Sequence, residues 1–308
     1  MIEATGLTKR YGGTRAVNDL SFTVLPGQVT GFLGPNGSGK STTMRLILGL
    51  DAPDSGSVTV GGRPYAACRR PLFQAGALLE AKAFHGGRSA RNHLLCLALS
   101  NGINRARVDE VLDLVGLTGA ARRRAGGFSL GMSQRLGIAA ALLGDPPVLM
   151  LDEPVNGLDP EGVLWIRTLL RTLAAEGRTV LLSSHLMSEM AMTADRLVII
   201  GRGRLIAQAT MADLLAAGPG ASVTVRSPQA GALTALLTAR GATVTRQGED
   251  TLAVTGTTAE AIGELARTSG LTLTGLAAHQ ATLEDRYMEL TRDSADYRAV
   301  ATRNGDRP

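Results

Sequence analysis

The stretch Gly34-Pro35-Asn36-Gly37-Ser38-Gly39-Lys40-Ser41-Thr42 decides the fold, because it fits the pattern G-x-x-x-x-G-K-[ST]. Backbone N–H groups of such a loop wrap nucleotide phosphates. Upstream, the apolar run Gln28–Leu33 predicts a short buried strand. Downstream, Lys40–Leu50 predicts a helix whose N-terminus faces the phosphates, where free N–H groups and the helix dipole favour negative charge. These flanks favour a phosphate-binding loop over a flexible Gly/Ser turn.

Lysine usage supports this interpretation. The chain has 32 basic residues, of which only Lys9, Lys40 and Lys82 are lysine. A compact ammonium can reach the β- and γ-phosphates of a nucleotide where a wide guanidinium does not fit. We therefore expect Lys40 to bind phosphate and to take part in catalysis.

Composition limits the class of protein. At 308 residues with 44% hydrophobic residues, the chain can form one large domain and a smaller one. The net charge of +5 comes from scattered arginines, so no nucleic-acid partner is expected. Cys68 and Cys96 are the only cysteines, and we see neither a signal peptide nor an apolar run of membrane-spanning length. We expect a cytoplasmic protein without disulfides.

Short apolar runs alternate with helical segments over residues 1–215, which predicts an α/β domain with a mixed, mostly parallel sheet. Its N-terminal part alternates as antiparallel strands do, and residues from about 83 to 143 form a helical insertion. The expected strands are Ile2–Leu7, Ala16–Val24, Gln28–Leu33, Ser57–Val60, Val148–Leu151, Thr179–Ser183 and Arg196–Ile200.

A change of composition near residues 216–220 predicts a linker. Residues 221–291 then predict a small α+β accessory domain with the order β-α-β-β-α-β, as in ferredoxin-like folds. Its last strand is expected at Leu271–Leu276, followed by a helix from about Leu283 to Thr291. The polar residues 292–308 are expected to form a flexible tail.

Two carboxylates follow the apolar run Leu149–Leu151. In a phosphate-loop protein, the end of such a strand handles Mg²⁺ and the attacking water. We expect Asp152 to hold Mg²⁺ together with the Ser41 hydroxyl, and Glu153 to orient or deprotonate the water. Two solvated carboxylates at a strand end are the alternative, which the preceding phosphate loop disfavours.

The segment Phe128-Ser129-Leu130-Gly131-Met132, followed by Gln134-Arg135, opens a helix just upstream of that strand. With it, residues 1–215 resemble the nucleotide-binding subunit of ABC transporters, because the segment is similar to that family's LSGGQ signature. Ser129 and Gly131 match, whereas Leu130 and Met132 depart from the family's Gly and Gln. The resemblance implies a head-to-tail homodimer of two cassettes around two ATP molecules, in which Ser129 and Gly131 face the γ-phosphate bound by the partner.

The resemblance implies roles at further positions. Tyr11 lies where the family has an aromatic side chain that stacks on adenine; a surface tyrosine is the alternative. Gly157-Leu158-Asp159 resembles the loop that crosses the dimer interface, so Asp159 is expected near the nucleotide. His185 follows the strand Thr179–Ser183, where the family's switch histidine contacts the γ-phosphate.

One position departs from the family. A glutamine normally lies at the hinge between sheet and helical insertion, where it touches Mg²⁺ and water. Alignment of Gly76-Ala77-Leu78-Leu79 puts Glu80 at that position, whereas Gln74 lies upstream of the apolar strand. Glu80 is therefore expected to contact Mg²⁺ and nucleotide, with ATP turnover preserved and its Mg²⁺ dependence altered.

Within the family, the single cassette, hinge, signature and C-terminal domain are most similar to exporters of the ABC-2 type, including daunorubicin- and bacitracin-resistance subunits. The resemblance implies ATP hydrolysis that drives export of a drug, antibiotic or lipid-like molecule through a separate permease. The subunit would then be peripheral on the cytoplasmic face of the plasma membrane. The alternative is a soluble ABC-type ATPase that acts on nucleic acid or ribosomes, or as a regulatory module.

Overall fold

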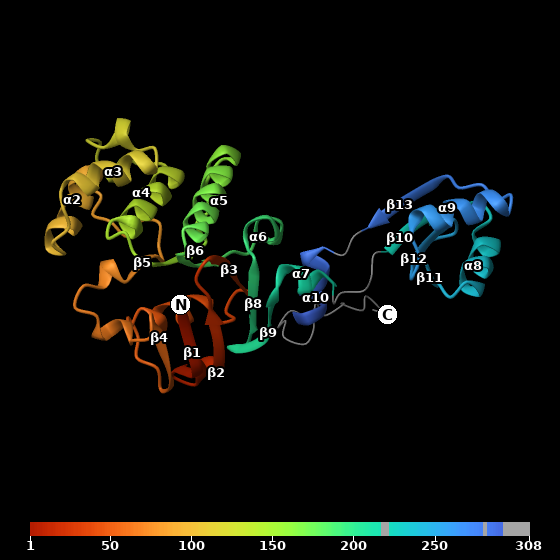
Figure 1. The fold of residues 1–308 in the computed structure, drawn as a ribbon, viewed down its shortest axis with the longest axis horizontal. Coiled ribbons are helices and arrows are strands. Elements are labelled where there is room, and N and C mark those ends of the chain that lie inside the picture. The colour runs from red at the N-terminus through yellow and green to blue at the C-terminus, as the bar shows by residue number, and fades with distance from the viewer. Residues whose placement is uncertain (217–221, 280–281, 292–308) are drawn as a thin grey trace, which may run out of the picture. The chain divides into compact units, whose positions relative to one another are not determined.

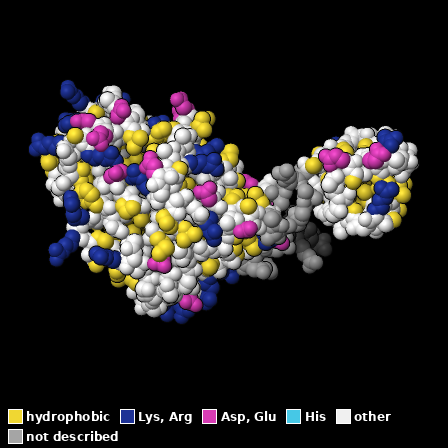
Figure 2. Space-filling view, in the orientation of Figure 1, with side chains coloured by type: hydrophobic (Ala, Val, Ile, Leu, Met, Phe, Trp, Pro, Cys, Tyr) yellow, Lys and Arg dark blue, Asp and Glu magenta, His cyan; other side chains and the backbone are white. Residues whose placement is uncertain are grey.

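The computed structural model describes residues 1–216, 222–279 and 282–291 (Figure 1). The described residues divide into two compact units: the first is Met1–Met211 together with Leu290 and Thr291, and the second begins at Ala212 and ends at Glu289. Most of the expected linker and all of the expected tail lie outside the described residues. Among the described helices, none combines the length and apolar character needed to cross a membrane. On the face in Figure 2, basic and acidic side chains are interspersed over the first unit.

A six-stranded sheet with the order β5-β6-β7-β3-β8-β9 forms the frame of the first unit. All neighbouring pairs are parallel except β8 and β9, which form an antiparallel hairpin. Strands buried on both faces read as continuous apolar runs, which explains β3, β6, β7 and β8. The strands are β3 (Gln28–Leu33), β5 (Ala75–Leu78), β6 (Val148–Asp152), β7 (Thr179–Ser183), β8 (Arg196–Gly201) and β9 (Arg204–Thr210).

A second, antiparallel sheet has the order β2-β1-β4. Its strands are β1 (Ile2–Tyr11), β2 (Thr14–Val24) and β4 (Ser55–Val60). Helix α1 (Lys40–Ile47) contacts β2 and β4, and its buried side chains join both sheets in one apolar core. Phe22 of β2 stacks on Phe32 of β3 with ring centroids 5.4 Å apart. This core fixes the direction of α1, and thereby the position of the loop before it.

The helical insertion contains α2 (Ala90–Ser100), α3 (Ala106–Leu114) and α4 (Leu130–Leu142), and Figure 1 shows these helices grouped beside β5. Ser89 caps α2 by accepting a hydrogen bond from the backbone N–H of Asn92. Helix α4 packs on β5, while α5 (Pro160–Ala175) packs on β3 and β7. The shorter α6 (Met187–Thr193) follows β7.

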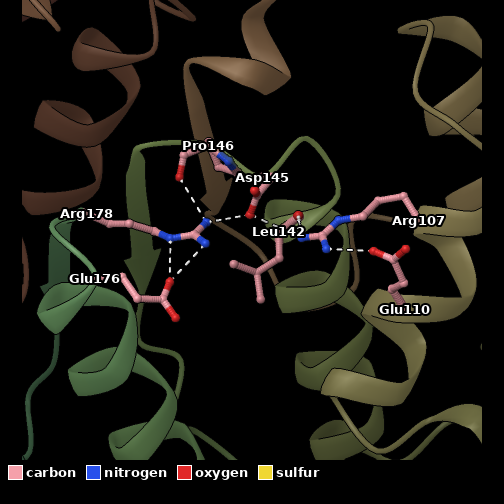
Figure 3. Close-up of polar contacts among 7 residues, drawn as sticks. All are labelled: Arg107, Glu110, Leu142, Asp145, Pro146, Glu176 and Arg178. Atoms are coloured by element: carbon pink, nitrogen blue, oxygen red, sulfur yellow. Dashed lines mark hydrogen bonds and ion pairs between the residues drawn. The ribbon is translucent and has the colours of Figure 1, made fainter.

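Asp145 ties the insertion to the sheet (Figure 3). Its Oδ1 accepts from Arg107 of α3 at 3.3 Å and from Arg178, just before β7, at 2.8 Å. Arg107 also pairs with Glu110, and Arg178 with Glu176. Asp145 has a φ of 51°, a left-handed conformation that Asp and Asn adopt more readily than most residues. One carboxylate therefore joins two arginines from separate parts of the unit.

The second unit contains a four-stranded antiparallel sheet with the order β11-β12-β10-β13. Helices α8 and α9 supply Leu233, Leu237, Ile262 and Leu265 to its core. The elements follow as β10 (Ser222–Arg226), α8 (Ala230–Ala239), β11 (Thr243–Arg246), β12 (Thr251–Thr255), α9 (Ala259–Thr268) and β13 (Gly275–His279). Helices α7 (Met211–Ala216) and α10 (Leu283–Thr291) complete the described chain.

The α/β class and the mixed sheet are as predicted, but some bounds differ. Strand β13 begins at Gly275 rather than Leu271, because the N–H groups of Leu271 and Thr272 are engaged by Ala266 and Gln229 instead of a ladder. Strand β1 continues to Tyr11 through a bulge that begins at Gly6 with a φ of 58°. Helix α1 ends early because Gly49 adopts a φ of 62°.

We predict a graded loss of stability at Asp145. Asp145→Asn keeps a residue that tolerates positive φ but removes both ion pairs, which should cost about 0.5–1 kcal/mol. Asp145→Ala removes the same pairs and adds backbone strain of about 1 kcal/mol. Urea unfolding of both variants measures the difference. An alanine variant as stable as the asparagine variant would contradict this account of the turn.

Candidate active site

The phosphate loop lies between β3 and α1 and is closely packed. Lys40, the first residue of α1, is 8% exposed, and its Nζ donates to the carbonyl oxygens of Gly34 at 2.6 Å and Pro35 at 3.2 Å. Burial lowers the pKa of Lys40, while the nearby charges of Glu153 and Asp152 oppose that shift. The loop therefore holds a desolvated ammonium beside the N-terminus of a helix, which favours bound anions.

Asp152, the last residue of β6, connects three elements. Its Oδ2 accepts from Ser41 Oγ of α1 at 2.8 Å, and its Oδ1 accepts from Ser183 Oγ at the end of β7. Asp152 and Ser183 are register partners in the parallel pair β6 and β7. The strand ends thus bring a carboxylate and two hydroxyls together. Ser41 and Asp152 are hard oxygen donors of the kind that Mg²⁺ prefers, so the residues fit a magnesium site.

Glu153 lies one residue past β6 in a left-handed conformation with a φ of 51°. For a residue of this type, such a backbone costs about 1–3 kcal/mol and is kept only where the surroundings hold it. Its N–H donates to the Ser183 carbonyl and Oγ at 3.2 and 3.0 Å. Its carbonyl oxygen accepts from Gln134 Nε2 at 2.8 Å and from the Asn156 N–H at 3.2 Å. The backbone of Glu153 is therefore held on both sides.

The Glu153 carboxylate is paired with His185. Glu153 Oε2 lies 2.7 Å from His185 Nδ1 and also accepts from the His185 N–H at 3.4 Å. The imidazole is 54% exposed and the carboxylate 24%. A carboxylate that bonds one ring nitrogen of a histidine orients the ring and leaves the other nitrogen facing solvent.

The phosphate loop, Asp152 and Glu153 line one cavity of about 410 Å³. Its residues are Ala16, Asn36, Gly37, Ser38, Gly39, Lys40, Ser41, Thr42, Asp152 and Glu153. The cavity thus brings together most of the loop and both carboxylates predicted from the sequence. Outside this lining, Gly34 and Pro35 accept hydrogen bonds from Lys40, and His185 contacts Glu153. Among the described residues, no group of three or more His, Cys, Asp or Glu side chains is arranged to bind a metal alone.

Three predicted residues lie at helix starts outside this cavity. Ser129 caps α4 by accepting from the Met132 N–H, and Gly131 follows in its first turn. Asp159 caps α5 by accepting from the Gly162 N–H at 2.8 Å. A Cβ on Gly131 would lie 3.1 Å from the Gly157 carbonyl oxygen, so the α4 N-terminus approaches the loop before α5 closely.

Tyr11 and Glu80 also lie outside the cavity lining. Tyr11 is 47% exposed, and its hydroxyl donates to Asp51 Oδ2 at 2.7 Å. Hydrogen bonds from Arg45 and Tyr11 lower the pKa of Asp51 to about 2. Glu80 is exposed and lines a separate cavity together with Arg45 and Phe84. The roles expected for Tyr11 and Glu80 stay predictions.

Ser183 and Gln134 also hold the site together, and the sequence does not predict either contact. Ser183 ends an apolar strand, as Asp152 does, but its contact with Asp152 depends on β7 lying beside β6. The sequence alone does not predict that β7 lies beside β6. The contact of Gln134 with Glu153 joins a helix to a strand end across 19 positions, and no local pattern signals it.

The fold and this site define a phosphate-loop nucleotide-binding protein. The family model described as "ABC transporter" matches residues 17–156, and a domain of unknown function matches residues 221–284. The bacitracin transport ATP-binding protein BcrA of Bacillus licheniformis is 43% identical over 209 residues, which cover 67% of this chain and 68% of that protein. The uncharacterized ABC transporter ATP-binding protein YdbJ of Bacillus subtilis is 35% identical over 297 residues, covering 94% and 95%.

Solved structures agree. The dimeric structure of MJ0796, a bacterial ABC transporter cassette, superimposes with a TM-score of 0.63 at 25% identity, covering 68% of this chain and 99% of that one. The chain belongs to the family of ABC transporter ATP-binding proteins. The resemblance inferred from the signature segment is thereby confirmed, and the chain is an ATP hydrolase.

We predict that two loop glycines respond differently to alanine. Gly39 has a φ of 103°, and a Cβ there would overlap the Ala16 carbonyl oxygen. Gly37 has a φ of 78°, but a Cβ there would meet nothing within 4 Å. Gly39→Ala should weaken ATP binding by about tenfold or more, and Gly37→Ala by clearly less. Calorimetric titration with ATP checks this order, and equal affinities would contradict it.

Proposed function

We propose that this chain is the ATP-binding subunit of an ABC-2 type export system, in which ATP hydrolysis drives a separate permease. One observation carries the proposal. Lys40, Ser41, Asp152 and Glu153 converge in one cavity, whereas the signature residues Ser129 and Gly131 do not line it. The cavity of one chain thus contains the residues that bind and hydrolyse ATP, but not Ser129 and Gly131, which cover the γ-phosphate. A second copy supplies them.

We assign each residue of the site a role in ATP binding or hydrolysis. Lys40 and the N–H groups of the loop 34–42 bind the phosphates, and Tyr11 stacks on adenine. Ser41 and Asp152 hold Mg²⁺, which neutralises phosphate charge when bound. Glu153 orients and deprotonates the attacking water, and His185 contacts the γ-phosphate through its free ring nitrogen. Glu80 is the predicted further contact to Mg²⁺.

Dimer closure completes each site. Ser129 and Gly131 at the α4 N-terminus of one chain meet the γ-phosphate on the loop of the other, and Asp159 lies at the interface between them. Loss of the γ-phosphate removes this bridge and opens the dimer. The dimer of the MJ0796 cassette supports this arrangement for a relative of the same fold.

The names of two relatives support export as the process that ATP hydrolysis drives. BcrA is named a bacitracin transport protein, and SrtF of Streptococcus pyogenes, 36% identical over 206 residues, a lantibiotic transport protein. We therefore favour an antibiotic, drug or lipid-like substrate over a role on nucleic acid or ribosomes. The subunit works at the cytoplasmic face of the plasma membrane, bound to its permease.

The permease docks between β5 and the helical insertion. A second cavity of about 410 Å³ lies there, lined mainly by apolar side chains with Arg45 and Glu80 beside them. Leu50, which is 56% exposed, belongs to this lining. Exposed apolar side chains around a cavity are typical of a protein–protein contact.

Glu153→Gln tests the hydrolytic assignment. The amide cannot accept the proton of water, so turnover should fall at least about 100-fold, within the range of general-base catalysis. ATP binding should persist, and the variant should elute as an ATP-bound dimer on size exclusion. Lys40→Ala is the control, because it should weaken nucleotide binding and prevent this dimer. Normal turnover of Glu153→Gln would overturn the assignment of the base.

Co-purification tests the transport assignment. An affinity-tagged chain should retain a polytopic membrane protein from detergent-solubilised membranes of its own cells. Leu50→Arg should lose that protein while still binding ATP. Leu164→Arg is the matched control, because Leu164 on α5 is 58% exposed and does not line the second cavity. Recovery of ribosomes or nucleic acid in place of a membrane protein would refute the proposal.

A further inference from the structure

Gln134 is a buried polar residue of α4 that does not line the phosphate cavity. It is 3% exposed, and its Nε2 donates to the carbonyl oxygen of Glu153 at 2.8 Å. Its Oε1 is buried and has no hydrogen-bond partner within the described residues. A buried amide that satisfies only one of its two ends is costly. The bond that it does make therefore has a specific use.

The hydrogen bond from Gln134 stabilises the backbone conformation of Glu153. The carbonyl that Gln134 contacts belongs to the residue with a φ of 51°, so the bond fixes the orientation of the peptide group just after a strained position. The N–H side is held by Ser183. With both peptide groups fixed, the side chain leaves the backbone in one direction, toward the cavity that it lines. Removal of the Gln134 bond leaves only the longer bond from Asn156 on this carbonyl.

The start of α4 is attached to the same segment at a second point. Leu130 packs directly against Gly157, so closely that a Cβ on Gly157 would overlap the Leu130 side chain. Gly131 also approaches the Gly157 carbonyl oxygen. Helix α4 thus contacts the chain at residue 153 through a hydrogen bond and at residue 157 through packing. A shift of α4 cannot leave this segment unchanged.

We propose that Gln134 is a positioning residue for ATP hydrolysis, which holds the backbone of Glu153 so that its carboxylate addresses the attacking water. Because Gln134 belongs to the signature helix, the placement of this chain's base depends on the helix that covers the partner's nucleotide. The inference rests on the proposed function, in which Glu153 is the base and α4 faces the second site. Gln134 itself does not line the phosphate cavity.

The first test separates catalysis from binding. Gln134→Met keeps the length and burial of the side chain and removes the donor. Gln134→Glu keeps its shape and replaces the donated N–H by an oxygen. Both should lower kcat by about 10- to 100-fold, the effect of a displacement of about 1 Å in a catalytic group. The Kd for ATP, measured by titration with Mg²⁺ omitted, should change by less than about threefold.

A matched control comes from Gln28 at the start of β3. Its Oε1 is likewise buried without a partner, but Gln28 does not line the phosphate cavity. Gln28→Met should leave kcat unchanged, and its melting temperature shows the cost of such a replacement. If Gln134→Met and Gln134→Glu lose ATP affinity and kcat together, Gln134 serves only the fold and the inference is wrong.

The second test is a double variant. Single-turnover rates are compared for Gln134→Met, Glu153→Gln and their combination. If Gln134 acts through Glu153, its substitution should add no further loss once Glu153→Gln is present. Additive losses would overturn the inference. A Glu153→Gln protein with normal turnover would refute the proposed base, whereas an inactive Glu153→Gln beside a fully active Gln134→Met would refute only the role of Gln134.

Discussion

The hydrogen bond from Ser41 Oγ to Asp152 Oδ2, 2.8 Å long, joins residues 111 positions apart in the chain. It forms because α1 starts at the same sheet edge where β6 and β7 end, and parallel strands present their carboxyl ends at one edge. Ser183 Oγ holds the other oxygen of the same carboxylate. These bonds fix the loop at Ser41, the carboxylate of Asp152 and the end of β7 relative to one another. The apolar core around α1 maintains this geometry.

Glu153, the residue after Asp152, directs its side chain to a different partner. Asp152 and Glu153 are adjacent, yet one contacts Ser41 and the other His185. A left-handed turn at Glu153 separates their directions. Backbone hydrogen bonds with Ser183 and Gln134 stabilise this strained turn, so its cost is offset by groups outside the Glu153–His185 pair. Contacts with both β7 and α4 therefore determine the backbone conformation of Glu153, the proposed base.

Much of this could be predicted from the sequence, because the chemical groups follow apolar strands. The phosphate loop follows Gln28–Leu33, the carboxylates follow Leu149–Leu151, and His185 follows Thr179–Ser183. The contacts that orient these groups could not be predicted, since Ser183 depends on strand order and Gln134 on helix packing. The predicted start of β13 at Leu271 is wrong for a similar reason. The N–H groups of Leu271 and Thr272 donate to a carbonyl near the end of α9 and to the Gln229 side chain, so they do not pair with a neighbouring strand.

We propose that each ATP site is completed by a second copy of the chain. The most direct measurement mixes two variants that are each expected to be inactive alone, Lys40→Ala and Ser129→Asp. Aspartate still caps α4, but its charge repels the γ-phosphate. In a mixed dimer, the intact loop of the second protein meets the intact signature of the first. ATP turnover should return on mixing; a mixture as inactive as its components would contradict a site shared between two chains.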